Sequence, residues 1–227
     1  ENTNKPNILS RIYGGGIYDN INATNIYLKA SNSSNKLVVF GGSNVESKVA
    51  NSNITMQGAT VYQIYGGSNS NGTVQKSNIN LVSGNVTEVY GGGYNKEVTS
   101  SEIIEKGTTT DTIYGGSNLG NEVSTSKVII ESGNVTNVFG GGYKSNVSTS
   151  NINLTGGNAT NIYDGSSTSG TVNTSNISWT KGMASNVFGG GYNTNNNNAN
   201  VILQGASVNN IYGGCNSNGV ANNNRSS

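Results

Sequence analysis

The sequence contains no histidine, a single cysteine (Cys215) and a single proline. Without histidine it lacks the commonest metal ligand and the side chain best suited to general acid–base work near neutral pH. One cysteine allows no internal disulfide. These absences exclude much familiar enzymology, and we expect neither a cofactor nor a metal ion.

Charge and long apolar runs are also scarce. Twelve Lys and Arg residues against 11 Asp and Glu residues are scattered singly, so no basic stripe is present to engage a phosphate backbone. We therefore expect no nucleic-acid partner. No apolar run approaches the roughly 20 residues of a membrane helix, so membrane insertion is not expected. Residues 1–10 lack the apolar stretch of a signal peptide, and we expect this chain to follow any export signal.

Only 32% of the residues are apolar, while glycine contributes 33 residues and asparagine is more abundant still. Low hydrophobicity is typical of disorder, but such disorder usually comes with high net charge or frequent proline. Here the formal net charge is +1. An asparagine-rich solvated tail is therefore the alternative to a folded protein.

A repeat decides between these two. An aromatic residue followed by a short glycine stretch, in one copy by Asp164-Gly165, recurs every 24 to 27 residues, at Tyr13, Phe40, Tyr65, Tyr90, Tyr114, Phe139, Tyr163, Phe188 and Tyr212. From Tyr65 onward the copies alternate between a Gly-Gly-Ser type and a Gly-Gly-Gly-Tyr type, each recurring after 49 residues. A register held over three double repeats favours a repeat architecture over disorder.

Within each copy the pattern V-x-x-S-x-I-x-L recurs, as in Val74 to Leu81, and its period of two predicts a β-strand. A glycine follows, for example Gly84, then a valine and the residue that precedes the aromatic, such as Val89. We interpret these as three short extended segments per copy. Helical spacing is not sustained anywhere, and so dense a distribution of glycine would make a helix costly.

A unit of this size cannot bury one face alone, but stacking pairs each strand with its copy about 4.8 Å away. We therefore predict an all-β protein, a right-handed parallel β-helix of about nine coils of 24–25 residues. The predicted solenoid covers residues 11–220 as a single domain. Residues 1–10 are expected to form a linker or partial cap, and residues 221–227 a disordered tail or the start of a continuing coil. The eight steps between the aromatics predict a stubby rod of roughly 38 Å.

Stacking also explains much of the composition. Asparagines in register can hydrogen-bond along the rod axis. Small hydroxyl side chains are expected to line a tight inward corner, at Ser77, Ser101, Ser126, Ser150 and Ser175. Glu105 occupies the inward position of Met56, so either Ile104 turns inward instead or the carboxylate lies at the mouth of a bend. Cys215 takes the position of Ser68 and is interpreted as a small-residue substitution.

The aromatics are the first candidate site. If Val89 points inward, Tyr90 should point outward, and the rings would form a stripe that can bind glycan or protein. The alternative is that the glycine corner turns the rings into the core, which the use of phenylalanine favours. The candidate ligand-binding set comprises Tyr65, Tyr90, Tyr114, Phe139, Tyr163, Phe188 and Tyr212.

A second row follows the triple glycine, at Tyr94, Tyr143 and Tyr192. Tyrosines in loops of a rigid scaffold are good contact residues, so this row joins the candidate set. The alternative is that each ring covers the glycine corner beside it.

Two further functions are weaker alternatives. Thr99-Ser100, Ser124-Thr125, Ser148-Thr149 and Asn173-Thr174 form a hydroxyl array that resembles those of ice-binding solenoids. A polysaccharide-active, lyase-like β-helix would need clustered acids. The aspartates are Asp19, Asp111 and Asp164, and their positions in the repeat do not bring them together. We therefore assign no catalytic residues.

The recurring [Val/Ile]-[Tyr/Phe]-Gly-Gly-[Gly/Ser] motif, together with Ser-x-Ile-x-Leu, resembles the repeat arrays of large cell-surface proteins of low-GC Gram-positive bacteria. The resemblance covers about residues 11–220. It implies a secreted or wall-attached, non-enzymatic adhesin or stalk, with a glycan or a host-surface protein as partner. Because the chain ends in mid-coil at Ser227, we expect it to be a fragment of a longer protein, with exposed ends that favour end-to-end self-association.

Overall fold

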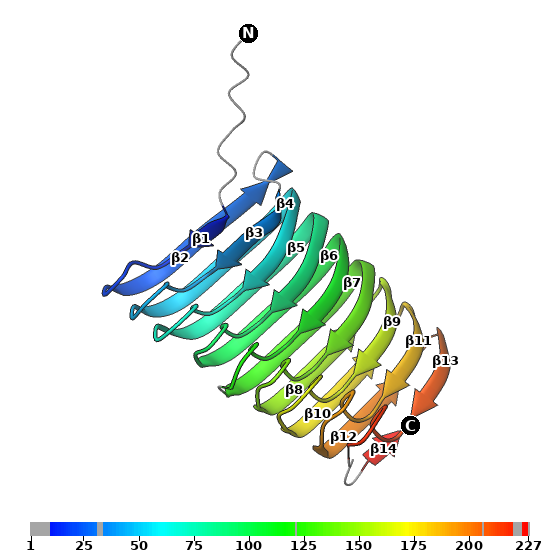
Figure 1. Cartoon of the computed structure of the whole chain (residues 1–227). Helices are drawn as coiled ribbons and strands as arrows, with labels where there is room; N and C mark the ends of the chain where they lie inside the picture. Colours follow the sequence, from blue (N-terminus) through cyan, green and yellow to red (C-terminus); the bar gives the residue numbers. More distant parts are fainter. Residues whose placement is uncertain (1–9, 31–33, 121, 206, 220–223, 227) are drawn as a thin grey trace.

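The computed structural model describes residues 10–30, 34–120, 122–205, 207–219 and 224–226, and these form a parallel β-solenoid without an α-helix (Figure 1). The strands are β1 (Arg11–Tyr13), β2 (Asn20–Lys29), β3 (Ser34–Phe40), β4 (Lys48–Tyr65), β5 (Thr73–Tyr90), β6 (Val98–Tyr114), β7 (Val123–Phe139), β8 (Val147–Leu154), β9 (Asn158–Tyr163), β10 (Val172–Trp179), β11 (Met183–Phe188), β12 (Asn196–Leu203), β13 (Ser207–Tyr212) and β14 (Asn224–Ser226).

Each coil consists of a first arm, a glycine corner, a second arm and a loop. Strands β8 and β9 are the two arms of one coil, whereas β4 to β7 each run through both arms as one long, bent strand. The corner glycines have positive φ angles, a conformation that is strained for other residues. They are Gly58, Gly84, Gly107, Gly133, Gly157, Gly182 and Gly205.

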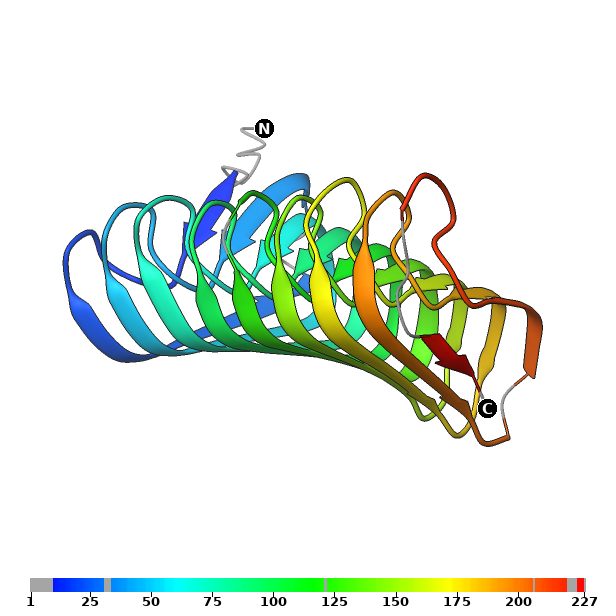
Figure 2. The same cartoon turned by 90° about the horizontal axis from the view of Figure 1, so that it is seen from below.

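Successive coils stack in parallel and in register (Figure 2). Ile54 pairs with Ile79, and Ile79 pairs with Ile103 one coil further on. Stacked aromatic rings of neighbouring coils have their centroids 4.6–5.1 Å apart, which is the spacing of paired strands. The stack has about eight turns. The predicted parallel β-helix is confirmed.

Three buried columns run along the rod. The largest contains the Ile, Leu, Val and Ala side chains of both arms, including Ile79 and Leu81. A valine column with Val74 forms the second, and the aromatic column forms the third. Val74 and Ser77 are both buried although they are three residues apart, so the first arm bends between them. A coil with few apolar residues can therefore fold, because the coils on both sides cover each of them.

The predicted serine column is confirmed, since all its members have exposed fractions of 0–3%. The hydroxyl groups of Ser101 and Ser126 donate to the carbonyls of Gly115 and Gly140 at 2.7 Å, so these two members of the column bond to the glycine loop of their own coil. Asparagine ladders are also present. One ladder joins Asn137, Asn161, Asn186 and Asn210 through side-chain hydrogen bonds of 2.9–3.0 Å.

The loop that follows the aromatic closes the coil without forming a strand. Its amides still bond from coil to coil, for example Gly66 N to Tyr90 O at 2.9 Å and Gly67 N to Gly92 O at 3.1 Å. A Cβ on Gly66 would lie 1.7 Å from Ser77 Oγ, so the loop passes too close to the serine column for any side chain. The prediction of three extended segments per coil is therefore corrected to two strand arms and a hydrogen-bonded glycine loop.

The position of Glu105 shows which of the two expectations holds, an inward Ile104 or a carboxylate at the mouth of a bend. Its side chain points inward and is fully buried, while Ile104 is only half-buried. The carboxylate accepts hydrogen bonds from Gly107 N (2.9 Å), Thr108 N (2.5 Å) and Thr110 Oγ1 (3.0 Å), and also from the Thr108 hydroxyl. The expectation that Ile104 replaces it is wrong. The carboxylate sits beside the corner at Gly107 because that bend supplies unpaired amides.

The ends of the predicted domain are only partly described. The stack begins with β1 at Arg11, which pairs with β3, and Asn224–Ser226 pairs in parallel with β12. The expected linker or partial cap covers residues 1–10, of which residues 1–9 lie outside the described residues, as do residues 220–223 and 227.

Candidate functional site

The rings of the aromatic column are stacked on one another. All nine rings lie nearly parallel to their neighbours, with interplanar angles of 6–10°. The seven from Phe40 to Phe188 have exposed fractions of 1–7%, whereas Tyr212 is 45% exposed at the C-terminal end of the stack. The expectation of an outward-facing stripe is therefore wrong for these seven, and the core alternative holds. The ring faces of these residues are covered by neighbouring rings and are not open to a ligand; Tyr163 and Phe188 also line, together with Tyr212, a pocket of about 490 Å³ at the C-terminal end of the column. The set concerned is Tyr65, Tyr90, Tyr114, Phe139, Tyr163 and Phe188.

Buried tyrosine hydroxyl groups need partners, and the loops supply them across two coils. Asn118 Nδ2 donates to the Tyr65 hydroxyl at 3.0 Å, and Ser167 and Asn216 hydrogen-bond to Tyr114 and Tyr163 in the same way. These tyrosines head the Gly-Gly-Ser type of coil, with Asp164 in the glycine position after Tyr163. Burial raises the pKa of the Tyr114 hydroxyl to about 12, and the hydrogen bond from Ser167 opposes that rise.

The other type of coil carries phenylalanine at two of its three described positions, Phe139 and Phe188, and Tyr90 at the third. The Tyr90 hydroxyl is held by Glu88 of its own strand at 3.1 Å. From Tyr65 onward, the double repeat of 49 residues thus matches the coils in which a loop two coils away supplies a partner for the tyrosine hydroxyl. In the sequence, this difference between the two coil types is visible from Tyr65 onward as a preference for tyrosine in one type and for phenylalanine in the other.

The second tyrosine row covers the first. The rings of Tyr94, Tyr143 and Tyr192 pack edge-on against Tyr65, Tyr114 and Tyr163, with centroids 5.7–6.1 Å apart. Each ring therefore covers an aromatic of the preceding coil, not the glycine corner beside it. Tyr94 and Tyr192 keep exposed fractions of 38% and 46%, so both remain accessible to a ligand.

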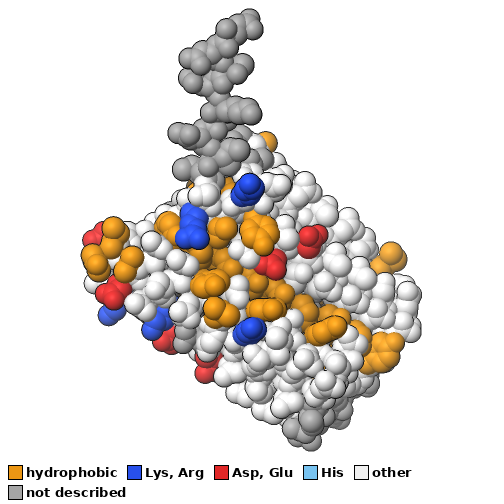
Figure 3. Space-filling view, viewed as in Figure 1, with side chains coloured by type: hydrophobic (Ala, Val, Ile, Leu, Met, Phe, Trp, Pro, Cys, Tyr) orange, Lys and Arg blue, Asp and Glu red, His pale blue; other side chains and the backbone are white. Residues whose placement is uncertain are grey.

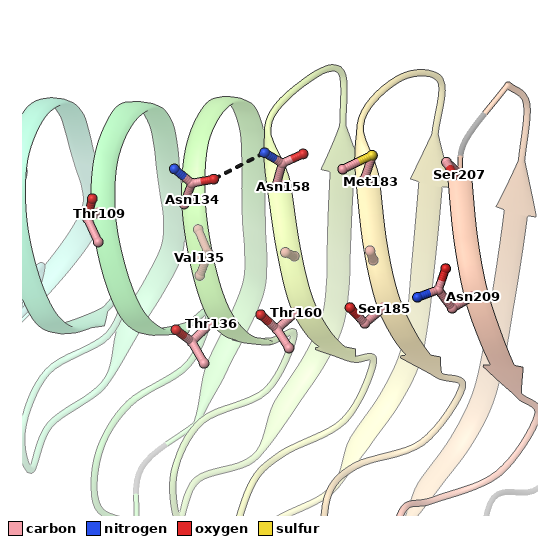
Figure 4. A pocket seen from close by; sticks show the side chains of 12 residues that line it. Thr109, Asn134, Val135, Thr136, Asn158, Thr160, Met183, Ser185, Ser207 and Asn209 are labelled. Carbon is pink, nitrogen blue, oxygen red and sulfur yellow. Dashed lines mark hydrogen bonds between the residues drawn. The ribbon is translucent and has the colours of Figure 1, made fainter.

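An open groove crosses the second arms of β7, β9, β11 and β13, and sequence reasoning missed it (Figure 4). Its volume is about 340 Å³. One wall contains Asn134, Asn158, Met183 and Ser207, which are in register, and the other contains Thr136, Thr160, Ser185 and Asn209. The floor is the strand segment between the walls, at Val135, Ala159 and Ala184, whose side chains are buried in the core.

The two walls present hydroxyl or amide groups at each coil except at Met183, whose exposed thioether side chain interrupts the first wall in β11. Asn158 Nδ2 donates to Asn134 Oδ1 at 3.1 Å, which leaves the amide oxygen of Asn158 facing the next coil (Figure 4). Thr136 and Thr160 are exposed and lie in the same column. None of the lining side chains is charged. The signal in the sequence is the recurrence of a polar residue on each side of the second-arm valine or alanine, with Met183 as the exception.

The hydroxyl array lies on the first arms. Thr125, Thr149 and Thr174 are in register there, and the column continues with Ser100 on one side and Asn198 on the other. Because only three threonines are consecutive, the column is a short match to an ice-binding surface.

The aspartates do not come together. Asp164 is fully buried, whereas Asp111 is exposed on a second arm and Asp19 is exposed in the loop before β2. Within the described part of the chain, no group of three or more His, Cys, Asp or Glu side chains could hold a metal ion. Cys215 lies in the loop column of Ser68 and Ser117, as interpreted, and its thiol approaches Thr194 O at 3.0 Å.

Comparison with known proteins gives no match, whether with family models, with curated proteins or with solved structures. The described residues include no helix of the length and apolarity needed to cross a membrane. The fold and the surface groups therefore carry the functional argument.

Proposed function

We propose that this protein is a non-enzymatic module of a bacterial surface protein, an adhesin or stalk, that binds an extended neutral glycan in the groove of the second arms. The observation that carries the proposal is the pair of uncharged columns on the two sides of that groove, polar at every position except Met183. They repeat at the strand spacing of about 4.8 Å, so a linear polymer lying along the rod axis meets a hydroxyl or amide group of at least one wall at each coil.

The chemistry of the walls suits sugar hydroxyl groups. Threonine and serine hydroxyls both donate and accept, and asparagine amides do the same with separate atoms. The groove is shallow and preformed by the sheet, so binding requires little ordering of the protein. The rod itself suits a spacer role, because the hydrogen-bonded ladder runs without interruption from β3 to β12.

The absence of charge from the lining supports a binding role over a catalytic one. Glycoside hydrolysis uses a pair of carboxyl groups on the two sides of the scissile bond. The nearest position with a carboxylate in the wall column is Asp111, one coil before Thr136. Glu88 lies on the second arm of the coil before that, and its carboxylate is already held by Gln63 and the Tyr90 hydroxyl. The lyase-like alternative is tested directly by incubating the protein with uronate polymers and measuring new unsaturated chain ends.

Removal of two hydroxyl groups tests the groove. Thr136→Val with Thr160→Val keeps the β-branched shape and removes one donor and acceptor from each of two coils. At about 0.5–1.5 kcal/mol for each hydrogen bond, we expect the affinity for neutral polysaccharides to fall about tenfold, as measured by calorimetric titration after a glycan-array screen.

The matched control is Thr125→Val with Thr149→Val, which makes the same change on the first arms. This control should bind like the unmodified protein. If no neutral glycan binds, or if the two double variants bind equally well, the groove is not the contact surface.

A further inference from the structure

A second pocket of about 680 Å³ lies at the N-terminal end of the rod, where β1, β3 and β4 meet. Its lining includes Arg11, Lys36 and Tyr62, together with Ser10, Asn35 and Val38. We call this the basic pocket. It differs from the neutral groove in having two cationic side chains and an aromatic ring that is 41% exposed.

An irregularity of β3 builds the pocket. Ser34 pairs with Val61 and Val38 pairs with Gln63, so β3 takes four steps where β4 takes two. Bulges of this kind redirect side chains and are frequent beside functional sites. Here Leu37 remains buried in the core, while Lys36 is exposed on the side of Tyr62.

The two cations are available to a ligand. Arg11 and Lys36 are both exposed, and neither side chain has an ion pair or hydrogen bond with another residue that the structure describes. The ion pair seen within the described residues joins Lys127 to Glu102. In Figure 3, basic side chains border hydrophobic ones near the N-terminal end of this face.

Further along the same face the charge changes from positive to negative. Arg11, Val38, Gln63 and Glu88 occupy one column, with Glu88 three coils away from Arg11. Gln63 and the Tyr90 hydroxyl both donate to the Glu88 carboxylate, at 2.6 and 3.1 Å. An anionic ligand is therefore attracted to the basic pocket and repelled from the middle of the face.

We propose that the basic pocket binds the carboxylate of an acidic sugar residue. The Arg11 guanidinium can hold a carboxylate through two parallel hydrogen bonds, and Lys36 adds a second positive charge. The exposed ring of Tyr62 can pack against the apolar face of the sugar. The inference extends the proposed glycan binding to a charged residue and uses a separate set of side chains.

The test compares a uronate-containing oligosaccharide and a sialylated one with their carboxyl-reduced, neutral counterparts, by calorimetric titration at low and high salt. We expect at least one acid to bind about tenfold more tightly than its reduced form at low salt, with the difference decreasing at high salt. Arg11→Gln should remove that difference, and Tyr62→Ser should weaken the binding of the acid.

Lys181→Gln is the matched control, because it removes one exposed cation from the loop between β10 and β11. If it weakens acid binding as much as Arg11→Gln does, the attraction is only that of net charge and the pocket is not a site. Equal binding of the acids and their reduced forms would also overturn the proposal. The groove variants Thr136→Val and Thr160→Val should not change the preference for acid, so failure of either proposal can be recognised separately.

Discussion

Replacement of Asp164 by asparagine should stabilise the protein increasingly as the pH rises. Asp164 stands in the glycine position after the aromatic, where the neighbouring coils carry Gly140 and Gly189. Its exposed fraction is 0%, and neither of its carboxylate oxygens has a hydrogen-bond partner among the residues that the structure describes. Burial raises the pKa of this carboxyl well above its usual value of 3.8, and the nearby Ser175 hydroxyl opposes that rise.

The sign follows from proton linkage. In the unfolded chain Asp164 loses its proton near its usual pKa of 3.8, while the folded protein retains it. The contribution of this residue to stability is therefore fully present below that pH and is lost as the pH rises through the folded-state pKa. Over this window the free energy of unfolding falls by about 1.4 kcal/mol per pH unit relative to a residue that does not titrate.

Urea unfolding followed by far-ultraviolet circular dichroism, at several pH values between about 4 and 7, measures this slope. The amide of Asp164→Asn does not titrate, so the stability difference in favour of the variant should grow with pH. Asp111→Asn removes an exposed carboxylate and should leave the slope unchanged. If the free energies of unfolding of the unmodified protein and of Asp164→Asn change with pH in parallel, burial does not raise the pKa of the Asp164 carboxyl in the folded protein, and this reasoning is wrong.

Three further predictions concern the corners and the aromatic column. Gly84→Ala should prevent stable folding, because φ is +112° and the new Cβ would lie 2.1 Å from a backbone oxygen. Gly120→Ala, at a residue with φ +68° and no atom within 4 Å of the new Cβ, should lower the free energy of unfolding by only about 1–2 kcal/mol. Equal melting temperatures of the two variants would contradict this. Tyr114→Phe removes the hydrogen bond with Ser167 and should lower the free energy of unfolding by about 1 kcal/mol in chemical denaturation, and an unchanged value would refute the account of the double repeat. Burial raises the pKa of Tyr114 from 10.0 to about 12, so its contribution to stability is full below pH 10.0 and is lost toward pH 12. The circular dichroism signal and the tyrosinate absorbance should therefore change together in that pH range. Ionisation of the buried rings without unfolding would contradict this prediction.

Local patterns were sufficient to predict the architecture. The alternation from Ser77 to Leu81 places every second side chain on one face, and the 24–25-residue period means that only stacked copies can cover that face. The serine column was predictable for a similar reason, since a small hydroxyl residue recurs where the corner is tight. Glu105 could be flagged as an exception, but the amides that hold it belong to a bend whose geometry the sequence does not show.

The orientation of the aromatics depends on the tertiary structure. Alternation assigns Val89 and Tyr90 to opposite faces, and both are nevertheless buried, because the glycine loop and the edge-on ring of the second tyrosine row enclose the side that alternation would leave open. The partner of the Tyr65 hydroxyl is Asn118, 53 residues away, and no local pattern indicates that contact. The same holds for the basic pocket, which arises from a register shift between β3 and β4.

Sequence by itself thus determined the repeat, the parallel stacking and the inward positions of the strands, because these follow from side-chain periodicity and from the need to cover one apolar face. Only the tertiary structure decided which rings are buried, which hydroxyl groups find partners two coils away, and where the outer surface opens into a groove and a pocket. Those features depend on how loops and registers of different coils meet in space.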